Sequence, residues 1–346
     1  MSRTGPRDLA MAKRKSPFDR KLERLDALAD GGQPAKDELA IFLADREPYV
    51  AGATASLIVE LGLSEHVDLL AEALIRIVRG EQPDGGCMAS DKIIDALLRL
   101  EANEPDAYRA GLGYVRHEPS GTAFVDHAGG VRVGCATGLI GSNVHGALQD
   151  VVPLLCDPEP GVRAGTVLAL AQRRDEGAAA CVHLRLRAGD PAPEVVGACW
   201  EALLQIDPDR YVPEVEAVLD DSRSGELGLT GELGPVRELA ALALGESRHE
   251  GALPILERAL ERGAAPVATL TLAIALTRSD AAIDRLVALV ADAPESTALA
   301  AIEALGVHRE SASLAERLHR AVARRSKRLR AAVAESFGPC AGDAPP

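Results

Sequence analysis

The stretch that decides the fold is LGESRHEGALPILERALERGAAPV, residues 244–267. A second stretch, GALQDVVPLLCDPEPGV from Gly146 to Val162, also opens with Gly-Ala-Leu and also reaches a valine sixteen positions later. Each stretch is typical of a helix, a proline-containing turn and the start of a second helix. Because the same unit occurs more than once, the sequence predicts an array of internal repeats.

A shorter pattern fixes the period of the repeat. An Asp is followed five residues later by an apolar anchor in Asp45–Val50, Asp126–Val131, Asp157–Val162 and Asp190–Val195, and with weaker anchors in Asp84–Ala89 and Asp292–Thr297. Adding Val236, Val267 and Leu329 gives nine anchors. Gaps of 30 to 33 residues fit two helices of about four turns with short connections. Three longer gaps indicate insertions near residues 80–88, 117–126 and 221–231.

Local chemistry explains the pattern. An Asp that ends one helix can offer its carboxylate to the free N–H groups that open the next. An apolar residue tends to recur eight positions after the anchor, at Ile58, Leu97, Leu139, Leu170, Leu203, Leu244 and Leu305, with small residues between. One such pair of helices cannot bury its apolar face alone, so the repeats must stack. We therefore predict an all-α fold, an α-α superhelix or solenoid of about nine two-helix repeats.

The predicted solenoid spans residues 20–337, between a basic tail at 1–19 and a tail at 338–346, both expected to be disordered. The stretch 244–267 resembles HEAT-like repeats of the phycobilisome-lyase type, with Pro254 in the first turn of its first helix. Asp126 with Arg132, and Asp157 with Arg163, match the Asp and Arg that form a ladder between adjacent HEAT repeats. The resemblance implies that Arg163 reaches a carboxylate, with Asp126 or Asp157 as the expected partner. It implies a fold and no particular activity.

Charge and composition narrow the class of partner. The net charge is −14; residues 1–24 carry +5 and residues 309–330 carry +6, so the rest of the chain carries −25. This balance disfavours nucleic acid and favours a basic protein partner.

No apolar run has the length of a membrane-spanning helix and no export signal follows the amino terminus, which predicts a cytoplasmic protein without membrane attachment. High Ala, Arg and Gly with scarce Lys suggests a bacterial source.

Some HEAT-like proteins are enzymes, and one region keeps that alternative open. A Gly-rich stretch contains His117, Asp126, His127, Cys135 and His145, enough donors to bring three metal ligands together. The alternative function is therefore a HEAT-like enzyme of the metal-dependent hydroxylase, bilin lyase or DNA glycosylase type that uses residues 117–145. The six cysteines contain no CxxC pair, and the single Trp200 is expected in the core.

The sequence favours a non-catalytic protein-binding scaffold or adaptor with no cofactor, metal or catalytic residue. Its expected partner-binding residues are the acidic side chains of the third insertion, because insertions in repeat arrays often lie on the binding face. These residues are Asp220, Asp221, Glu226 and Glu232. The Arg-rich segment 317–330 is interpreted as the polar face of the closing repeat, with contact to an anionic surface as the alternative.

Overall fold

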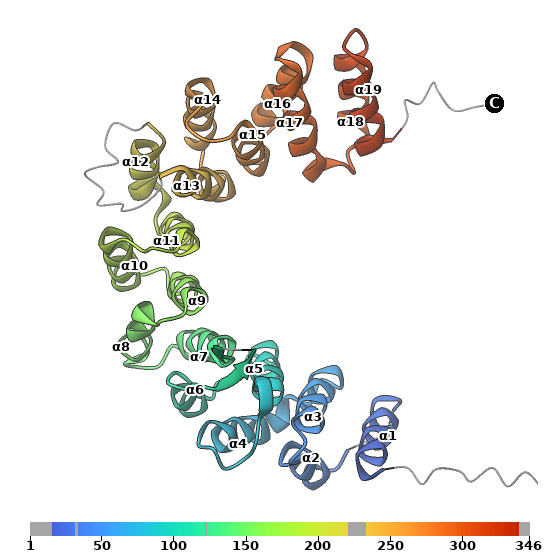
Figure 1. Ribbon diagram of the computed structural model, residues 1–346, viewed down its shortest axis with the longest axis vertical. Coiled ribbons are helices and arrows are strands. Elements are labelled where there is room, and N and C mark those ends of the chain that lie inside the picture. The colour runs from blue at the N-terminus through green and yellow to red at the C-terminus, as the bar shows by residue number, and fades with distance from the viewer. Residues whose placement is uncertain (1–15, 32–33, 122, 221–232, 339–346) are drawn as a thin grey trace, which may run out of the picture. The chain divides into compact units, whose positions relative to one another are not determined.

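The computed structural model describes residues 16–31, 34–121, 123–220 and 233–338. Within these residues the chain forms nineteen α-helices and one short β-hairpin, and it divides into two compact units, residues 1–142 and 143–346. Figure 1 shows the helices in chain order. The prediction of an all-α repeat fold is confirmed. No described helix has both the length and the apolar character needed to cross a membrane.

The first unit contains seven α-helices, which are α1 (Pro17–Ala29), α2 (Lys36–Leu43), α3 (Pro48–Glu60), α4 (Val67–Val78), α5 (Met88–Arg99), α6 (Pro105–Gly111) and α7 (Gly129–Gly141). Helices α1, α3, α5 and α7 pack side by side in that order, and α2, α4 and α6 form a second row against them (Figure 1). The hairpin joins β1 (His117–Ser120) to β2 (Ala123–Asp126), with His117 opposite Asp126.

The second unit repeats this arrangement with α8 (Ala147–Val151), α9 (Pro160–Ala171), α10 (Glu176–Ala188), α11 (Pro193–Ile206), α12 (Pro208–Leu219), α13 (Leu233–Ser247), α14 (Ala252–Arg262), α15 (Val267–Leu276), α16 (Asp280–Asp292), α17 (Glu295–Leu305), α18 (Ala312–Val322) and α19 (Lys327–Phe337). Successive odd-numbered helices from α9 to α19 pack on one another. Each also packs on the even-numbered helix that follows or precedes it, as two-helix repeats require.

The nine anchors all fall within the first four residues of an odd-numbered helix, from Val50 in α3 to Leu329 in α19. Seven of them are buried. Val267 is 36% exposed and Thr297 is half-buried, because the inward stripes of these two helices begin at Leu270 and Ala298. The anchor spacing therefore predicted where the second helix of each repeat begins, although not always its buried face.

Small residues allow the odd-numbered helices to approach closely. A Cβ atom on Gly245 of α13 would overlap the backbone carbonyl of Ala273 in α15. A Cβ on Gly52 of α3 would lie 3.0 Å from the Met88 carbonyl oxygen of α5. Because the helix backbones lie this close together, little space is left between them, and small side chains fill the core of a chain with few aromatic residues.

The repeat Asp makes the same hydrogen bond in four repeats. One carboxylate oxygen accepts the backbone N–H two residues later, at distances of 2.9 to 3.0 Å, in the pairs Asp45–Glu47, Asp126–Ala128, Asp157–Glu159 and Asp190–Ala192. This bond fixes the turn that precedes each odd-numbered helix. Asp84, which lies in the first insertion, instead accepts the backbone N–H groups of Ala89 and Ser90.

Several boundaries differ from the predictions. Helix α1 begins at Pro17, three residues before the expected start of the array at residue 20. The second insertion folds as the β-hairpin, whereas the sequence predicted essentially no strand. The third insertion, predicted near residues 221–231, falls in the range 221–232 that lies outside the described residues, as do the chain ends 1–15 and 339–346.

Candidate protein-binding groove

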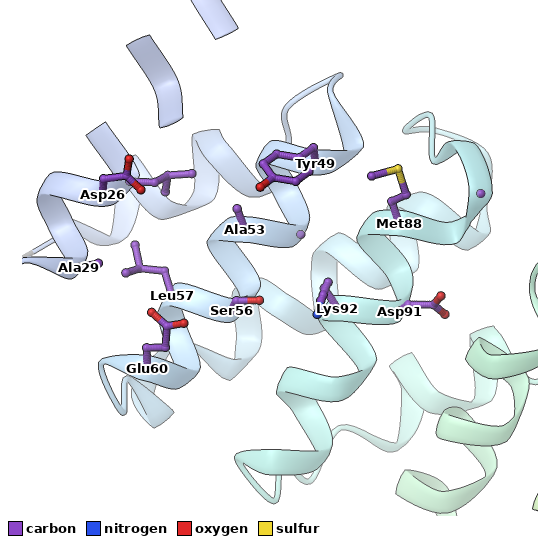
Figure 2. A pocket seen from close by; sticks show the side chains of 13 residues that line it. Asp26, Ala29, Tyr49, Ala53, Ser56, Leu57, Glu60, Met88, Asp91 and Lys92 are labelled. Atoms are coloured by element: carbon purple, nitrogen blue, oxygen red, sulfur yellow. The ribbon is translucent and has the colours of Figure 1, made fainter. Parts of the chain in front are cut away.

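An open groove of about 520 Å³ runs between α1, α3 and α5 of the first unit (Figure 2). Its walls come from Leu25, Asp26 and Ala29 on α1, from Tyr49, Gly52, Ala53, Ser56, Leu57 and Glu60 on α3, and from Gly86, Met88, Asp91 and Lys92 at α5 and the turn before it. A volume of this size lies within the usual range of ligand pockets, roughly 300–1,000 Å³.

Small side chains create the groove, and large ones border it. Ala53 and Ser56 lie one turn apart on α3 and leave space between the helices. Tyr49 and Met88 lie at one end of the groove in Figure 2 and are 53% and 49% exposed. The Tyr49 ring packs on the Phe18 ring with their centroids 6.1 Å apart, which limits its motion.

The groove is acidic. Asp26 and Glu60 lie toward the end opposite Tyr49 and Met88 (Figure 2), are exposed and form no ion pair with the rest of the described chain. Burial, with a smaller contribution from the negative charge of Asp84, raises the pKa of Asp91. Among the described residues that line the groove, Lys92 is the only basic one. The walls therefore combine apolar surface with an excess of negative charge.

The first insertion holds Met88 at the rim. The buried Asp84 carboxylate accepts the N–H groups of Ala89 and Ser90 at 2.8 and 3.0 Å and the Ser90 hydroxyl at 2.5 Å. Gly86 and Cys87 both adopt left-handed backbone conformations, with φ of 61° and 57°. Only a well-bonded loop retains a left-handed Cys, since this conformation costs a non-glycine residue about 1 kcal/mol or more.

Two side chains tie this loop to its neighbours. Gln82, which is buried, donates through Nε2 to the carbonyl oxygens of Leu43 and Asp45 at 2.8 and 3.1 Å. Glu118 of β1 accepts the Gly86 N–H through Oε1 at 3.0 Å. The Gly86 N–H and then Arg116 lower the pKa of Glu118, so it stays ionised at neutral pH. The hairpin therefore supports the loop that positions Met88.

Asp126 and Arg132 form a buried pair at the base of the hairpin. Arg132 Nη1 lies 2.6 Å from Asp126 Oδ2 and 2.8 Å from the Tyr114 carbonyl oxygen. Burial opposes ionisation of Asp126, but the N–H groups of Arg116 and Ala128 and the Arg132 guanidinium outweigh it and lower its pKa. The pair fixes the hairpin to α7.

Arg163 reaches a carboxylate of the following repeat. Its Nε and Nη2 donate to the two oxygens of Asp190 at 2.7 and 2.8 Å, and Nη1 donates to the carbonyl oxygens of Asp157 and Pro158. The expectation that Asp126 or Asp157 supplies this carboxylate is therefore replaced by Asp190. Asp157 contributes its main-chain carbonyl to Arg163, and its Oδ1 accepts the Glu159 N–H. Arg185 also binds Asp190.

The residues that the enzymatic alternative would use are not gathered into one site. Cys135 is fully buried in α7, and burial raises its pKa to about 12, so it is a thiol at neutral pH. The Asp126 carboxylate binds Arg132. His117 in β1 and His127 just after β2 are exposed, and His145 belongs to the second unit. Among the described residues, no three His, Cys, Asp or Glu side chains lie together as metal ligands would.

The predicted partner-binding residues lie mainly outside the described part of the chain. Asp221, Glu226 and Glu232 fall in the undescribed insertion. Asp220 caps α12, is exposed and forms an ion pair with Arg262 of α14. Trp200 is fully buried, as expected.

Sequence reasoning missed the groove. Its residues come from three helices, and the only sequence signal was the run of small residues 51–56 in an otherwise apolar helix. Comparison with known protein families and with curated proteins finds no match for this chain.

Proposed function

We propose that the protein is a non-catalytic scaffold of HEAT-like repeats that holds a segment of a basic protein partner in the groove between α1, α3 and α5. The observation that carries this proposal is a ready-made groove with an apolar floor and with two carboxylates, Asp26 and Glu60, that form no ion pair within the described residues. Protein interfaces commonly place apolar anchors in such pockets and use surrounding charge to select and attract the partner.

The surrounding structure supports a binding role. Gln82, Asp84 and Glu118 fix the loop that carries Met88, so little conformational entropy is lost when a partner binds. The −25 charge outside the two basic segments also raises the local concentration of cationic molecules. A cytoplasmic, bacterial-type setting belongs to this proposal and rests on composition.

Site-specific photo-crosslinking tests the proposal. A benzophenone amino acid in place of Tyr49, expressed in the native cell, should give one dominant adduct with a basic protein. The matched control is the same amino acid in place of Ile41, which is 68% exposed on α2 and does not line the groove. Equal adducts from both positions, or none from Tyr49, would reject the groove as the partner-binding site.

The acidic insertion remains a second proposed contact for the same partner. Changing Asp220, Asp221, Glu226 and Glu232 to their amides removes four charges without touching the buried helical stripes. Association should become slower and less sensitive to salt, because screening acts mainly on the approach of charged partners. An association rate unaffected by both the changes and salt would exclude this role.

A further inference from the structure

We infer that the groove selects an extended segment with a fixed order of chemistry: an apolar side chain at the Tyr49–Met88 end and, about five residues away, an Arg or Lys at the Asp26–Glu60 end. This inference rests on the proposed function, because it specifies which part of a partner the groove recognises. The arrangement of groups along α3 carries it (Figure 2).

The two ends of the groove differ in polarity. Tyr49, in the first turn of α3, and Met88, in the first turn of α5, expose large apolar surfaces, and Phe18 holds the tyrosine ring in place. Asp26 lies in the last turns of α1, and Glu60 is the last residue of α3. A bound segment would therefore meet the large apolar surfaces of Tyr49 and Met88 at one end, where Asp91 also lines the groove, and the exposed carboxylates of Asp26 and Glu60 at the other.

The spacing follows from helix geometry. Tyr49 and Glu60 are separated along α3 by about 16 Å, since each helical residue advances about 1.5 Å. An extended chain covers that distance in about five residues at about 3.3 Å each. The anchor and the cation of a matching segment should therefore be about five residues apart.

Small side chains on the floor of the groove suit an extended segment. An extended chain can place alternate side chains on the small residues Ala53 and Ser56 and keep the others in solvent.

The charges of the groove determine that the bound segment should carry a positive charge. Asp26 and Glu60 have no cationic partner in the described chain, whereas nearby carboxylates such as Glu38 and Asp45 are already paired with Arg24 and Lys21. Lys92 lies between the two ends of the groove and opposes a second cation there. A lone cation beyond the apolar anchor therefore fits better than a uniformly basic segment.

A graded series of synthetic peptides tests this inference. Each probe carries a Phe-Leu anchor and one Arg, joined by Gly-Ser spacers that run from about one to about seven residues. Fluorescence anisotropy should show the tightest binding near a spacer of about four residues, and binding about fivefold weaker at the shortest spacer.

Variants of the full chain identify the groove as the binding site. Asp26→Asn with Glu60→Gln should remove the dependence on spacer length, and Ala53→Trp should fill the groove and weaken every probe without changing charge. The matched control, Glu65→Gln with Glu250→Gln, makes the same charge change at exposed positions outside the groove and should behave like the unmodified protein. Thermal melting checks that each variant is folded.

Two outcomes overturn the inference. One is binding that follows peptide charge alone, whatever the spacer, and the other is a control pair that weakens binding as much as the groove pair. Neither outcome affects the crosslinking test of the scaffold, which uses the native partner. A Tyr49 adduct with spacer-independent peptide binding would retain the scaffold function and reject only this mode of recognition.

Discussion

Replacing Asp190 by Asn should be the most destabilising charge change in the second unit. The Asp190 side chain is 1% exposed and binds the guanidinium groups of Arg163 and Arg185 as well as the Ala192 N–H. Asparagine keeps the size and can still accept the Ala192 N–H. The change removes the negative charge that both arginines bind, and the Arg163 and Arg185 side chains are only 9% and 18% exposed.

The magnitude follows from burial. Breaking a buried ion pair by removing one partner costs about 3–5 kcal/mol, and because Arg185 retains some solvent contact we expect about 3 kcal/mol. The matched control is Asp175→Asn, which removes a more exposed pair with Arg173, 24% and 39% exposed, and keeps the α10 cap. Surface pairs contribute about 0–1 kcal/mol, so this control should change little.

Urea unfolding followed by circular dichroism measures both variants. Cooperativity in repeat arrays can be limited, so the slope of the transition has to be compared as well as its midpoint. A loss below about 1 kcal/mol for Asp190→Asn, no greater than for the control, would refute the argument that Arg163 and Arg185 depend on this carboxylate.

The pH dependence gives an independent check. Burial opposes ionisation of Asp190, but Arg163, the Ala192 N–H and Arg185 outweigh it, and its pKa is lowered. The folded pKa therefore lies below the unfolded value of about 3.9. This contribution to stability is fully present above that value and is lost as pH falls through the folded pKa. The stability difference between the parent protein and Asp190→Asn should shrink accordingly below about pH 4.

Two further predictions concern backbone positions. Gly138→Ala should lower the free energy of unfolding by about 1–3 kcal/mol, because the new Cβ would overlap the Tyr108 ring. Gly141→Ala has open space around the new Cβ and should raise stability by up to about 1 kcal/mol through helix propensity. Equal effects of the two changes in thermal melting would contradict this packing. Arg278 has φ of 55° in the turn after α15, so Arg278→Gly should relieve strain and raise stability by up to about 1 kcal/mol. Arg309→Gly, at a residue with φ of −55°, should lower stability. If Arg309→Gly were also stabilising, the left-handed backbone at Arg278 would not explain the effect of Arg278→Gly.

The sequence by itself determined the repeat. Apolar periodicity, turn-forming Asp residues and helix-start signals act over roughly ten residues, so all nine anchors could be placed near the start of an odd-numbered helix. The turn at the repeat Asp was predicted for the same reason, since the carboxylates of Asp45 and Asp157 accept the backbone N–H two residues later. The expected bond to the N–H groups inside the next helix is wrong at these two residues, because the accepted N–H belongs to the residue that precedes α3 or α9.

Only the tertiary structure decided how the repeats meet. Asp190 became the partner of Arg163 because stacking brings together residues that are 27 positions apart, and the sequence offered several equivalent carboxylates. The hairpin at 117–126 and the loop at 80–88 meet through Glu118 and Gly86, a pairing that no local pattern encodes. The groove likewise depends on the packing of three helices that local periodicity treats independently, because space between helices is set by which side chains face one another.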